Sequence, residues 1–220
     1  LTISRDVDDE MGNGQVKMLE LASADDVFGV FFNPLIFQGL PDAAAAGLPV
    51  YTVVQGGPEA AGLDNVYTPG LFCADCMRKV TIHQAQLIGA TKVATLALGQ
   101  SQASKDCGTL TKATFDHFGP ALGIEHVYLN DTLQLGLPNG IAPEVTAMKD
   151  LGVDYIATCI DNNSVLMLEQ ELERQGIGDV TVLLPQGYAD AEFLGNNADL
   201  LEGDVLGVFF RPFEGNREGT

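Results

Sequence analysis

The fold is decided by the stretch KVATLALGQSQ at residues 92–102 and by the residues that follow it. The run from Lys92 to Leu98 is rich in apolar and β-branched residues and predicts a buried strand, and a helix is predicted over Lys105–Phe118. The same strand–helix order recurs, with strands predicted at His126–Leu129, Tyr155–Ile160, Val180–Leu184 and Val205–Phe210 and helices at Ala142–Leu151 and Ser164–Gln175. This alternation indicates βαβ units, so we predict an α/β fold with parallel sheets.

The residues before Lys92 show the same alternation less regularly. Strands are predicted at Leu1–Ser4, Val27–Phe32 and Pro49–Val54, helices at Gln15–Ala22, from Asn33-Pro34 to near Gly47 and at Ala74–Ile88, and irregular structure over Gln55–Gly70. Val27–Phe32 is apolar throughout and is predicted to be buried on both faces of a sheet. The first helix is predicted to turn Val16, Leu19 and Leu21 inward.

Composition excludes several classes of function. The 220 residues include 11 Lys+Arg and 30 Asp+Glu, a net charge of −19, which disfavours nucleic acid as a partner because phosphate binding needs a basic face. Hydrophobic residues make up 46% of the chain, enough for a globular core in one or two domains. No apolar run approaches the roughly 20 residues that a membrane-spanning helix needs.

The order of motifs resembles the type I periplasmic binding proteins, in the branched-chain amino-acid-binding branch that serves ABC importers. The resembling segments are DDVFGV at 25–30, GLPV at 47–50, ATKVATL at 90–96, LGVDYI at 151–156 and the helix end at 170–176. The resemblance implies two Rossmann-like lobes that close over a ligand, with residues 1–89 in the first lobe, 90–206 in the second and 207–220 as a hinge-crossing strand and tail.

Members of this family begin with one more strand and helix and continue past the second crossing. We therefore expect an incomplete first lobe, in a chain that is part of a longer protein or that pairs its open sheet edge with a second copy as a homodimer. The chain begins with Leu1, and we expect that an export signal has been removed.

The resemblance also implies the function. It predicts a non-enzymatic, extracytoplasmic solute-binding protein, periplasmic or anchored at the cell surface as a lipoprotein, that binds a small organic ligand without a cofactor and delivers it to an ABC permease. A ligand-sensing regulatory domain of the same fold is the alternative.

Ligands of open parallel sheets bind outside the carboxyl ends of the strands, where helix N-termini supply amide hydrogens. The loops after the predicted strands give the candidate ligand-binding residues Asn33, Phe37, Gln55, Gly56, Gly57, Gln100, Ser101, Gln102, Asp161, Asn162, Gln186 and Tyr188. Asp161, the only acid among them, has two interpretations: a counter-ion for a ligand ammonium group, or the N-cap of the next helix. Where family members carry hydroxyls that hold a ligand carboxylate, this chain has Leu35-Ile36-Phe37 and Gln55-Gly56-Gly57, which favours a hydrophobic or aromatic ligand.

The four cysteines, Cys73, Cys76, Cys107 and Cys159, permit two disulfides in an oxidising compartment. Cys73 and Cys76 have the spacing of a thiol–disulfide oxidoreductase, or take part in a structural disulfide, local or with another cysteine. Cys159 is expected to be buried and inert. No second ligand pair for zinc, nucleophile motif or phosphate-binding loop occurs, so we predict no metal site, catalytic residue or nucleotide cofactor.

Overall fold

The computed structural model describes residues 13–24, 27–32, 38–52, 60, 62–67, 76–184 and 191–207. The chain forms two compact units. The first comprises Leu1–Cys76 with Ser101–Asp106, and the second comprises Met77–Gln100 with Cys107–Thr220. Both contain a parallel sheet with helices, which confirms the predicted α/β class. No helix within the described ranges is long and apolar enough to cross a membrane.

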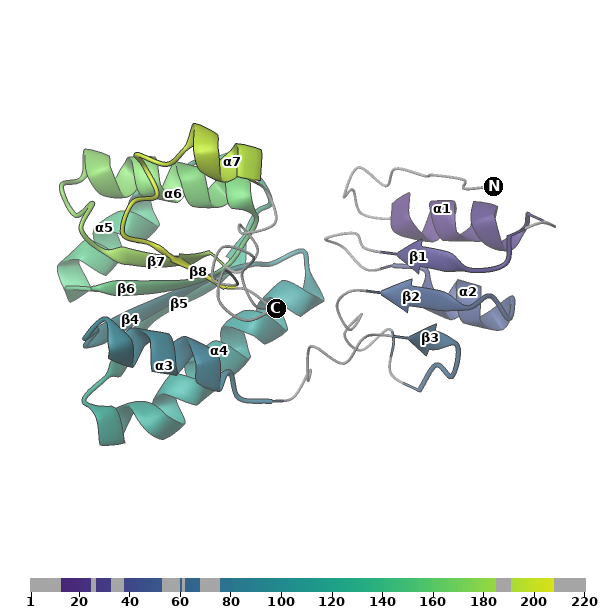
Figure 1. Cartoon of the computed structure of the whole chain (residues 1–220), viewed down its shortest axis with the longest axis horizontal. Helices are drawn as coiled ribbons and strands as arrows, with labels where there is room; N and C mark the ends of the chain where they lie inside the picture. Colours follow the sequence, from purple (N-terminus) through teal and green to yellow (C-terminus); the bar gives the residue numbers. More distant parts are fainter. Residues whose placement is uncertain are drawn as a thin grey trace, which may run out of the picture. The chain divides into compact units, whose positions relative to one another are not determined.

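The second unit is built on a five-stranded parallel sheet with the order β5-β4-β6-β7-β8. The strands are β4 (Lys92–Leu98), β5 (Glu125–Leu133), β6 (Tyr155–Cys159), β7 (Thr181–Leu184) and β8 (Val205–Leu206). The helices are α3 (Lys79–Leu87), α4 (Gln102–Leu122, of which the residues up to Asp106 group with the first unit), α5 (Ala142–Leu151), α6 (Asn162–Arg174) and α7 (Ala191–Asn196). Helices α3 and α4 lie on one face of the sheet and α5 and α6 on the other (Figure 1). Because both faces are covered, every residue of β6 and all of β4 after Lys92 are buried.

Asp154 fixes the amino end of this sheet. Its carboxylate accepts hydrogen bonds from the backbone N–H of Thr91 at 2.9 Å, the Thr91 hydroxyl at 2.7 Å and the backbone N–H of Lys92 at 2.9 Å. Its own N–H donates to the Lys92 carbonyl at 3.0 Å. These contacts set the register of β6 against β4 from the first residue pair onward.

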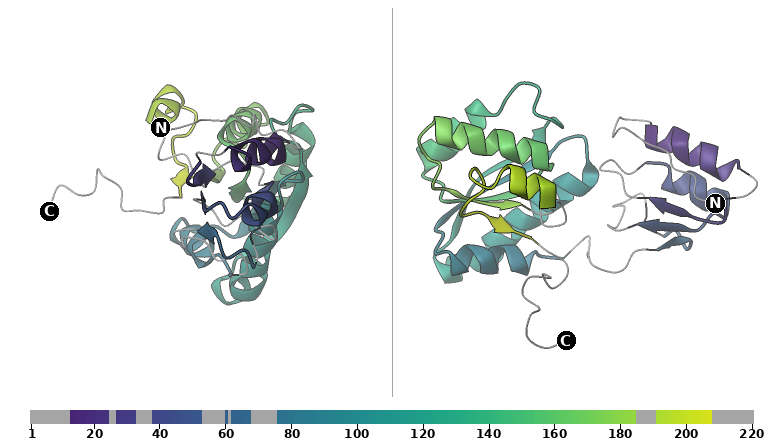
Figure 2. Two further views of the ribbon diagram at one scale, coloured as in Figure 1. Left: turned by 90° about the vertical axis from the view of Figure 1, so that its right-hand side faces the viewer. Right: turned by 45° about the horizontal axis from the view of Figure 1, so that its top comes forward.

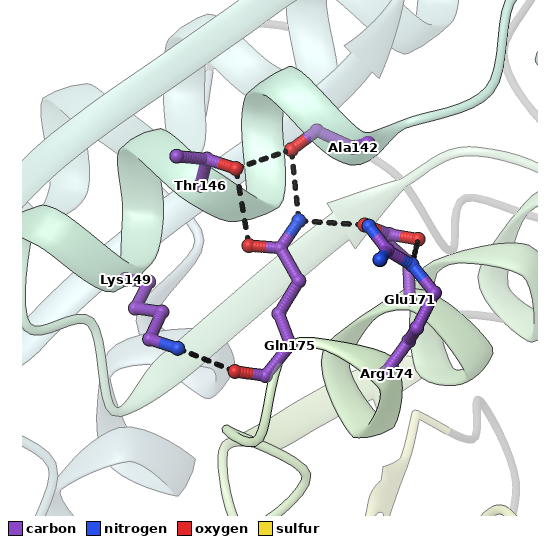
Figure 3. Close-up of polar contacts among 6 residues, drawn as sticks. All are labelled: Ala142, Thr146, Lys149, Glu171, Arg174 and Gln175. Carbon is purple, nitrogen blue, oxygen red and sulfur yellow. Dashed lines mark hydrogen bonds and ion pairs between the residues drawn. The ribbon is translucent and has the colours of Figure 1, made fainter.

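A polar cluster joins α5 to the end of α6 (Figure 3). The Gln175 side-chain amide donates to the Ala142 carbonyl at 3.1 Å and to Glu171 Oε1 at 2.6 Å, and its oxygen accepts from the Thr146 hydroxyl at 3.0 Å. The Lys149 ammonium donates to the Gln175 carbonyl. One side chain therefore bonds to the first turn of α5, to the middle of α5 and to the last turn of α6.

We expect Gln175→Ala to lower the free energy of unfolding by about 1–2 kcal/mol, because two partly buried hydrogen bonds and one exposed hydrogen bond are lost together. Urea denaturation measures this. Arg174→Ala is the matched control: its ion pair with Glu171 is solvent-exposed and should leave the midpoint unchanged. Equal effects of the two substitutions would contradict the bridging role of Gln175.

The first unit contains a three-stranded parallel sheet with the order β1-β2-β3. Its elements are α1 (Asn13–Ala22), β1 (Val30–Phe32), α2 (Leu40–Ala45), β2 (Val50–Thr52) and β3 (Val66–Tyr67). Met18 of α1 and Leu40 and Ala43 of α2 pack on Val30, Phe32 and Val50 of the sheet. Figure 2 shows the two helices and the three strands from a second direction.

Two predictions about burial in the first unit are wrong. The buried residues of α1 are Gly14 and Met18, whereas Val16 and Leu19 are 51% and 45% exposed. Val27–Phe32 is not buried on both faces, since Phe28 and Phe31 are 90% and 71% exposed. Phe31 lies in register with Tyr51 and Tyr67, on the face of the sheet opposite the residues that pack against α1 and α2.

Several predicted element boundaries are also corrected. Helix α2 begins at Leu40 and not near Asn33, because Gly39 adopts a left-handed conformation with φ of 89° and Pro41 suits the first turn. Strand β3 lies in a stretch predicted to be irregular, α3 begins at Lys79 and not Ala74, and α7 was not predicted. Helix α4 and strand β5 are longer than predicted at both ends. The predicted strand Leu1–Ser4 and the residues 208–210 lie outside the described ranges.

Candidate functional site

The carboxyl ends of β4 and β6 lie next to each other, with Ala97 paired to Cys159. The loops that contain Gln100 and Asp161 therefore leave the sheet from neighbouring strands. From β4 the chain crosses to β5 on one side, and from β6 it crosses to β7 on the other. This reversal of strand order marks the position at which open α/β sheets bind their ligands.

Gln100 joins this edge to the loop after β5. Its side-chain oxygen accepts a hydrogen bond from the Leu135 N–H at 3.0 Å, and the preceding Gly99 N–H donates to the Leu133 carbonyl at 2.8 Å. A Cβ on Gly99 would lie 3.0 Å from Thr132 Cα, so glycine allows the two backbones to approach closely. The side-chain oxygen of Gln100 is thus already hydrogen-bonded within the protein.

Ser101 and Gln102 start α4 and make local contacts. The buried Ser101 hydroxyl accepts from the Ser104 N–H at 3.3 Å, and the exposed Gln102 amide donates to Asp106 Oδ1 at 2.7 Å. These contacts are typical of the first turn of a helix. Ligand contact by either residue stays a prediction.

Asp161 is the N-cap of α6. Its Oδ1 accepts from the Ser164 N–H at 2.9 Å and its Oδ2 from the Ser164 hydroxyl at 2.5 Å, which confirms that interpretation of the sequence. Asn162 follows as the first residue of the helix and is partly buried. The cap holds the Asp161 carboxylate at the amino end of a 13-residue helix, and its role as a counter-ion for a ligand stays a prediction.

A disulfide between Cys107 and Cys159 links α4 to the end of β6 at this edge, with 5.9 Å between the two Cα atoms. Cys159 is buried, as predicted, and it is bonded to Cys107, a pairing that the predictions left open. Cys159 ends β6 two residues before Asp161, and Cys107 lies in the second turn of α4. Cys76 is also disulfide-bonded, and Cys73 lies outside the described ranges, so the two interpretations of this pair, a structural disulfide and a thiol–disulfide oxidoreductase, both stay predictions.

Several solved structures share this architecture at low sequence identity. An extracellular ligand-binding receptor from Rhodopseudomonas palustris HaA2 superposes with a TM-score of 0.70 at 14% identity, over 93% of this chain and 56% of that one. An ABC transporter substrate-binding protein from Desulfitobacterium hafniense in complex with Leu gives a TM-score of 0.64 at 17% identity, over 96% and 60% of the two chains. The chain has the fold of a type I periplasmic binding protein. The resemblance inferred from the sequence is therefore confirmed at the level of the fold.

A third type I periplasmic binding protein supports the same assignment. It is the solute-binding protein of an ABC transporter from Rhodopseudomonas palustris BisB5 in complex with 3,4-dihydroxybenzoic acid, with a TM-score of 0.64 at 19% identity over 83% of this chain and 50% of that one. The chain thus spans about half of the length of the binding proteins it resembles. No protein-family model and no curated protein matches it.

The remaining candidate residues of this binding-protein fold lie outside the described ranges: Asn33, Phe37, Gln55, Gly56, Gly57, Gln186 and Tyr188. Their contact with a ligand stays a prediction, as do the lobe boundaries 1–89, 90–206 and 207–220. Of the residues predicted from the sequence, the structure brings the Gln100 and Asp161 loops together at one edge of the second unit's sheet.

A hollow of about 410 Å³ lies at the opposite edge of that sheet, between the end of α4 and the start of β5. Its lining includes Phe115 and His126, whose Nε2 lies 2.9 Å from the Thr95 hydroxyl. Burial, together with the positive charge of Lys112, lowers the pKa of His126 to about 4. His126 is therefore neutral at neutral pH and packs as a core residue against Phe115.

Proposed function

We propose that this chain is part of an extracytoplasmic solute-binding protein, which captures a small organic ligand without catalysis and presents it to an ABC importer. The observation that carries the proposal is the adjacency of the Gln100 and Asp161 loops at the reversal of strand order, in a fold shared with solved solute-binding proteins. Ligands of open α/β sheets bind at such positions.

In the proposed mechanism the ligand contacts both lobes only when they are closed. Binding then shifts the population from the open to the closed form, because the closed form offers the larger set of contacts. The importer would recognise the closed form. A ligand-sensing domain would share the binding step and differ in the partner that responds.

The ligand class follows from the charges at the proposed site. The amino end of α6 carries a partial positive charge that favours a ligand carboxylate, and the adjacent Asp161 carboxylate favours an ammonium group. The similar binding proteins are described in complex with Leu and with 3,4-dihydroxybenzoic acid, each a carboxylate on an apolar body. We propose that this chain binds an amino-acid-like or an aromatic carboxylate.

A thermal-shift panel tests the proposal, because a ligand that binds only the folded protein raises the melting temperature. The panel contains leucine, phenylalanine, benzoate, 4-hydroxybenzoate and 3,4-dihydroxybenzoate. Leucinol and benzyl alcohol, which lack the carboxylate, serve as matched controls. We expect a saturable shift with at least one carboxylate and none with its alcohol; a cooperative melt that no carboxylate shifts would contradict the proposal.

Two substitutions of Asp161 separate its role in the helix from its proposed role in binding. Asp161→Ala should lower the free energy of unfolding by about 1 kcal/mol through loss of the N-cap, whereas Asp161→Asn keeps an acceptor for the Ser164 N–H and should cost little. Asp161→Asn should weaken an ammonium-bearing ligand about tenfold, since a charge-assisted contact is lost, and leave benzoates unaffected. Isothermal titration measures the affinities. If leucine bound the wild type and Asp161→Asn with equal affinity, Asp161 would not be part of the ligand site.

A further inference from the structure

An acidic side chain lies on the buried face of α6. Glu169 is 3% exposed and is flanked along the helix by Leu168 and Leu172, which are completely buried. Asp204, the residue immediately before β8, is partly buried. An ionised carboxylate is costly to bury, so Glu169 and Asp204 each need either a hydrogen-bonding or charged partner or a bound proton.

The contacts of the two carboxyl groups show whether they are stabilised by a partner or by a proton. Asp204 Oδ1 accepts from the Val182 N–H at 2.8 Å. Glu169 Oε1 and Asp204 Oδ2 are buried, and among the described residues no N–H or hydroxyl donates to either atom. The two carboxyl groups lie within hydrogen-bonding reach of each other, and carboxyl oxygens can form a hydrogen bond only when one of the two groups is protonated. One of the two therefore carries the proton that the other accepts.

The electrostatics agree with this geometry. Burial, with smaller contributions from Asp204 and from Glu173 on the same helix, raises the pKa of Glu169 to about 9. Burial also raises the pKa of Asp204. Asp204 and Glu173 are the charged groups that act on Glu169, and the packed strand β7 (Thr181–Leu184) contributes no titratable side chain.

We propose that Glu169 and Asp204 share one proton, and that this proton holds the start of β8 against α6, so that its loss at alkaline pH releases β8 from the sheet. Within the described residues, which end at Gly207, strand β8 has two residues and pairs only with β7, through Val205 and Leu206 and the Gly207 N–H to the Leu184 carbonyl at 2.8 Å. So few backbone contacts make the carboxyl pair a large share of what fixes this strand. The inference concerns the second unit alone and holds whatever ligand the protein binds.

The sign of the effect follows from proton linkage. When β8 is released, Glu169 meets water and returns to an ordinary pKa near 4.3, so the closed form holds one proton more than the open form at pH values between the two. The pair is therefore stabilised at lower pH and weakened as the pH rises. The opening equilibrium should rise about tenfold for each pH unit in this window.

Amide hydrogen exchange between about pH 7 and pH 8.5 measures the opening, after correction for the intrinsic exchange rate. The reporters are the Gly207 and Val182 amides. The reference is the Asp154 amide, which donates to the Lys92 carbonyl between the inner strands β4 and β6. In the wild type we expect both reporters to lose protection about tenfold per pH unit and to exchange faster than the reference. Glu169→Gln keeps a donor to Asp204 and should abolish the pH dependence, while Glu173→Gln is the matched control and should retain it.

Three results would overturn the proposal. The first is an equal pH dependence in Glu169→Gln and the wild type. The second is exchange of Gly207 and Val182 no faster than Asp154, which means that β8 does not open separately. The third is restored protection at alkaline pH on adding millimolar Ca²⁺ to the wild type, which assigns the pair to a cation. If Glu169→Gln does not fold, carboxyl-carbon NMR of the wild type decides, and an ordinary pKa for Glu169 refutes the shared proton.

Discussion

Replacing Cys107 and Cys159 together with serine should lower the free energy of unfolding of the second unit by about 4 kcal/mol. The disulfide closes a loop across 52 residues of sequence, and the entropy that such a cross-link removes from the unfolded chain accounts for an effect of this size. Urea denaturation of the oxidised wild type and of the double variant measures the difference.

Reduction provides the control. A reductant should reproduce the loss in the wild type and cause little further change in the second-unit transition of the double variant, because Cys76 belongs to the first unit. If reduction of the wild type leaves that transition in place, the disulfide is not a major source of its stability. The double variant should also bind the ligand found in the thermal-shift panel more weakly, since the bond fastens α4 to the end of β6 beside the Asp161 loop.

Much of the second unit could be predicted from the sequence because local and tertiary signals agree there. The bounds of β4 and α5 match the prediction at both ends. Strand β4 is a mainly apolar segment, and α5 has Ala142-Pro143 at its start and Gly152 directly after its end. The order of strands and helices then placed the Gln100 and Asp161 loops at one edge, which the pairing of β4 with β6 confirms. The N-cap role of Asp161 was recognisable from its place before a helix.

The features that could not be predicted depend on contacts between residues that are distant in the sequence. Whether Val16 or Met18 faces the sheet is a rotation of one helix, and hydrophobicity alone did not fix it. Phe31 is exposed because α1 and α2 cover the other face of the described sheet, which its own segment cannot reveal. The pairing of Cys107 with Cys159 requires the spatial order of β4 and β6, and the burial of Glu169 requires the position of Asp204, 35 residues later in the sequence.

Gly119→Ala should destabilise the second unit by about 3 kcal/mol. Gly119 lies in the last turn of α4, and a Cβ there would stand 2.3 Å from the Ile124 carbonyl oxygen, a backbone atom that no rotamer change can move aside. The Ile124 N–H also donates to the Gly119 carbonyl at 3.0 Å. Relief of the clash must therefore shift the start of β5, where Glu125 is paired with Lys92 of β4.

Gly195→Ala is the matched control for this substitution. Gly195 is also helical, in α7, and a Cβ there meets no atom within 4 Å. Alanine should leave stability unchanged or raise it by up to about 1 kcal/mol, because it restricts the unfolded chain and favours helix. Thermal and urea unfolding compare the two variants. A Gly119→Ala protein as stable as Gly195→Ala would mean that α4 and β5 do not approach each other this closely, whereas the expected contrast ties the loss to the contact at the α4–β5 junction and not to alanine in a helix.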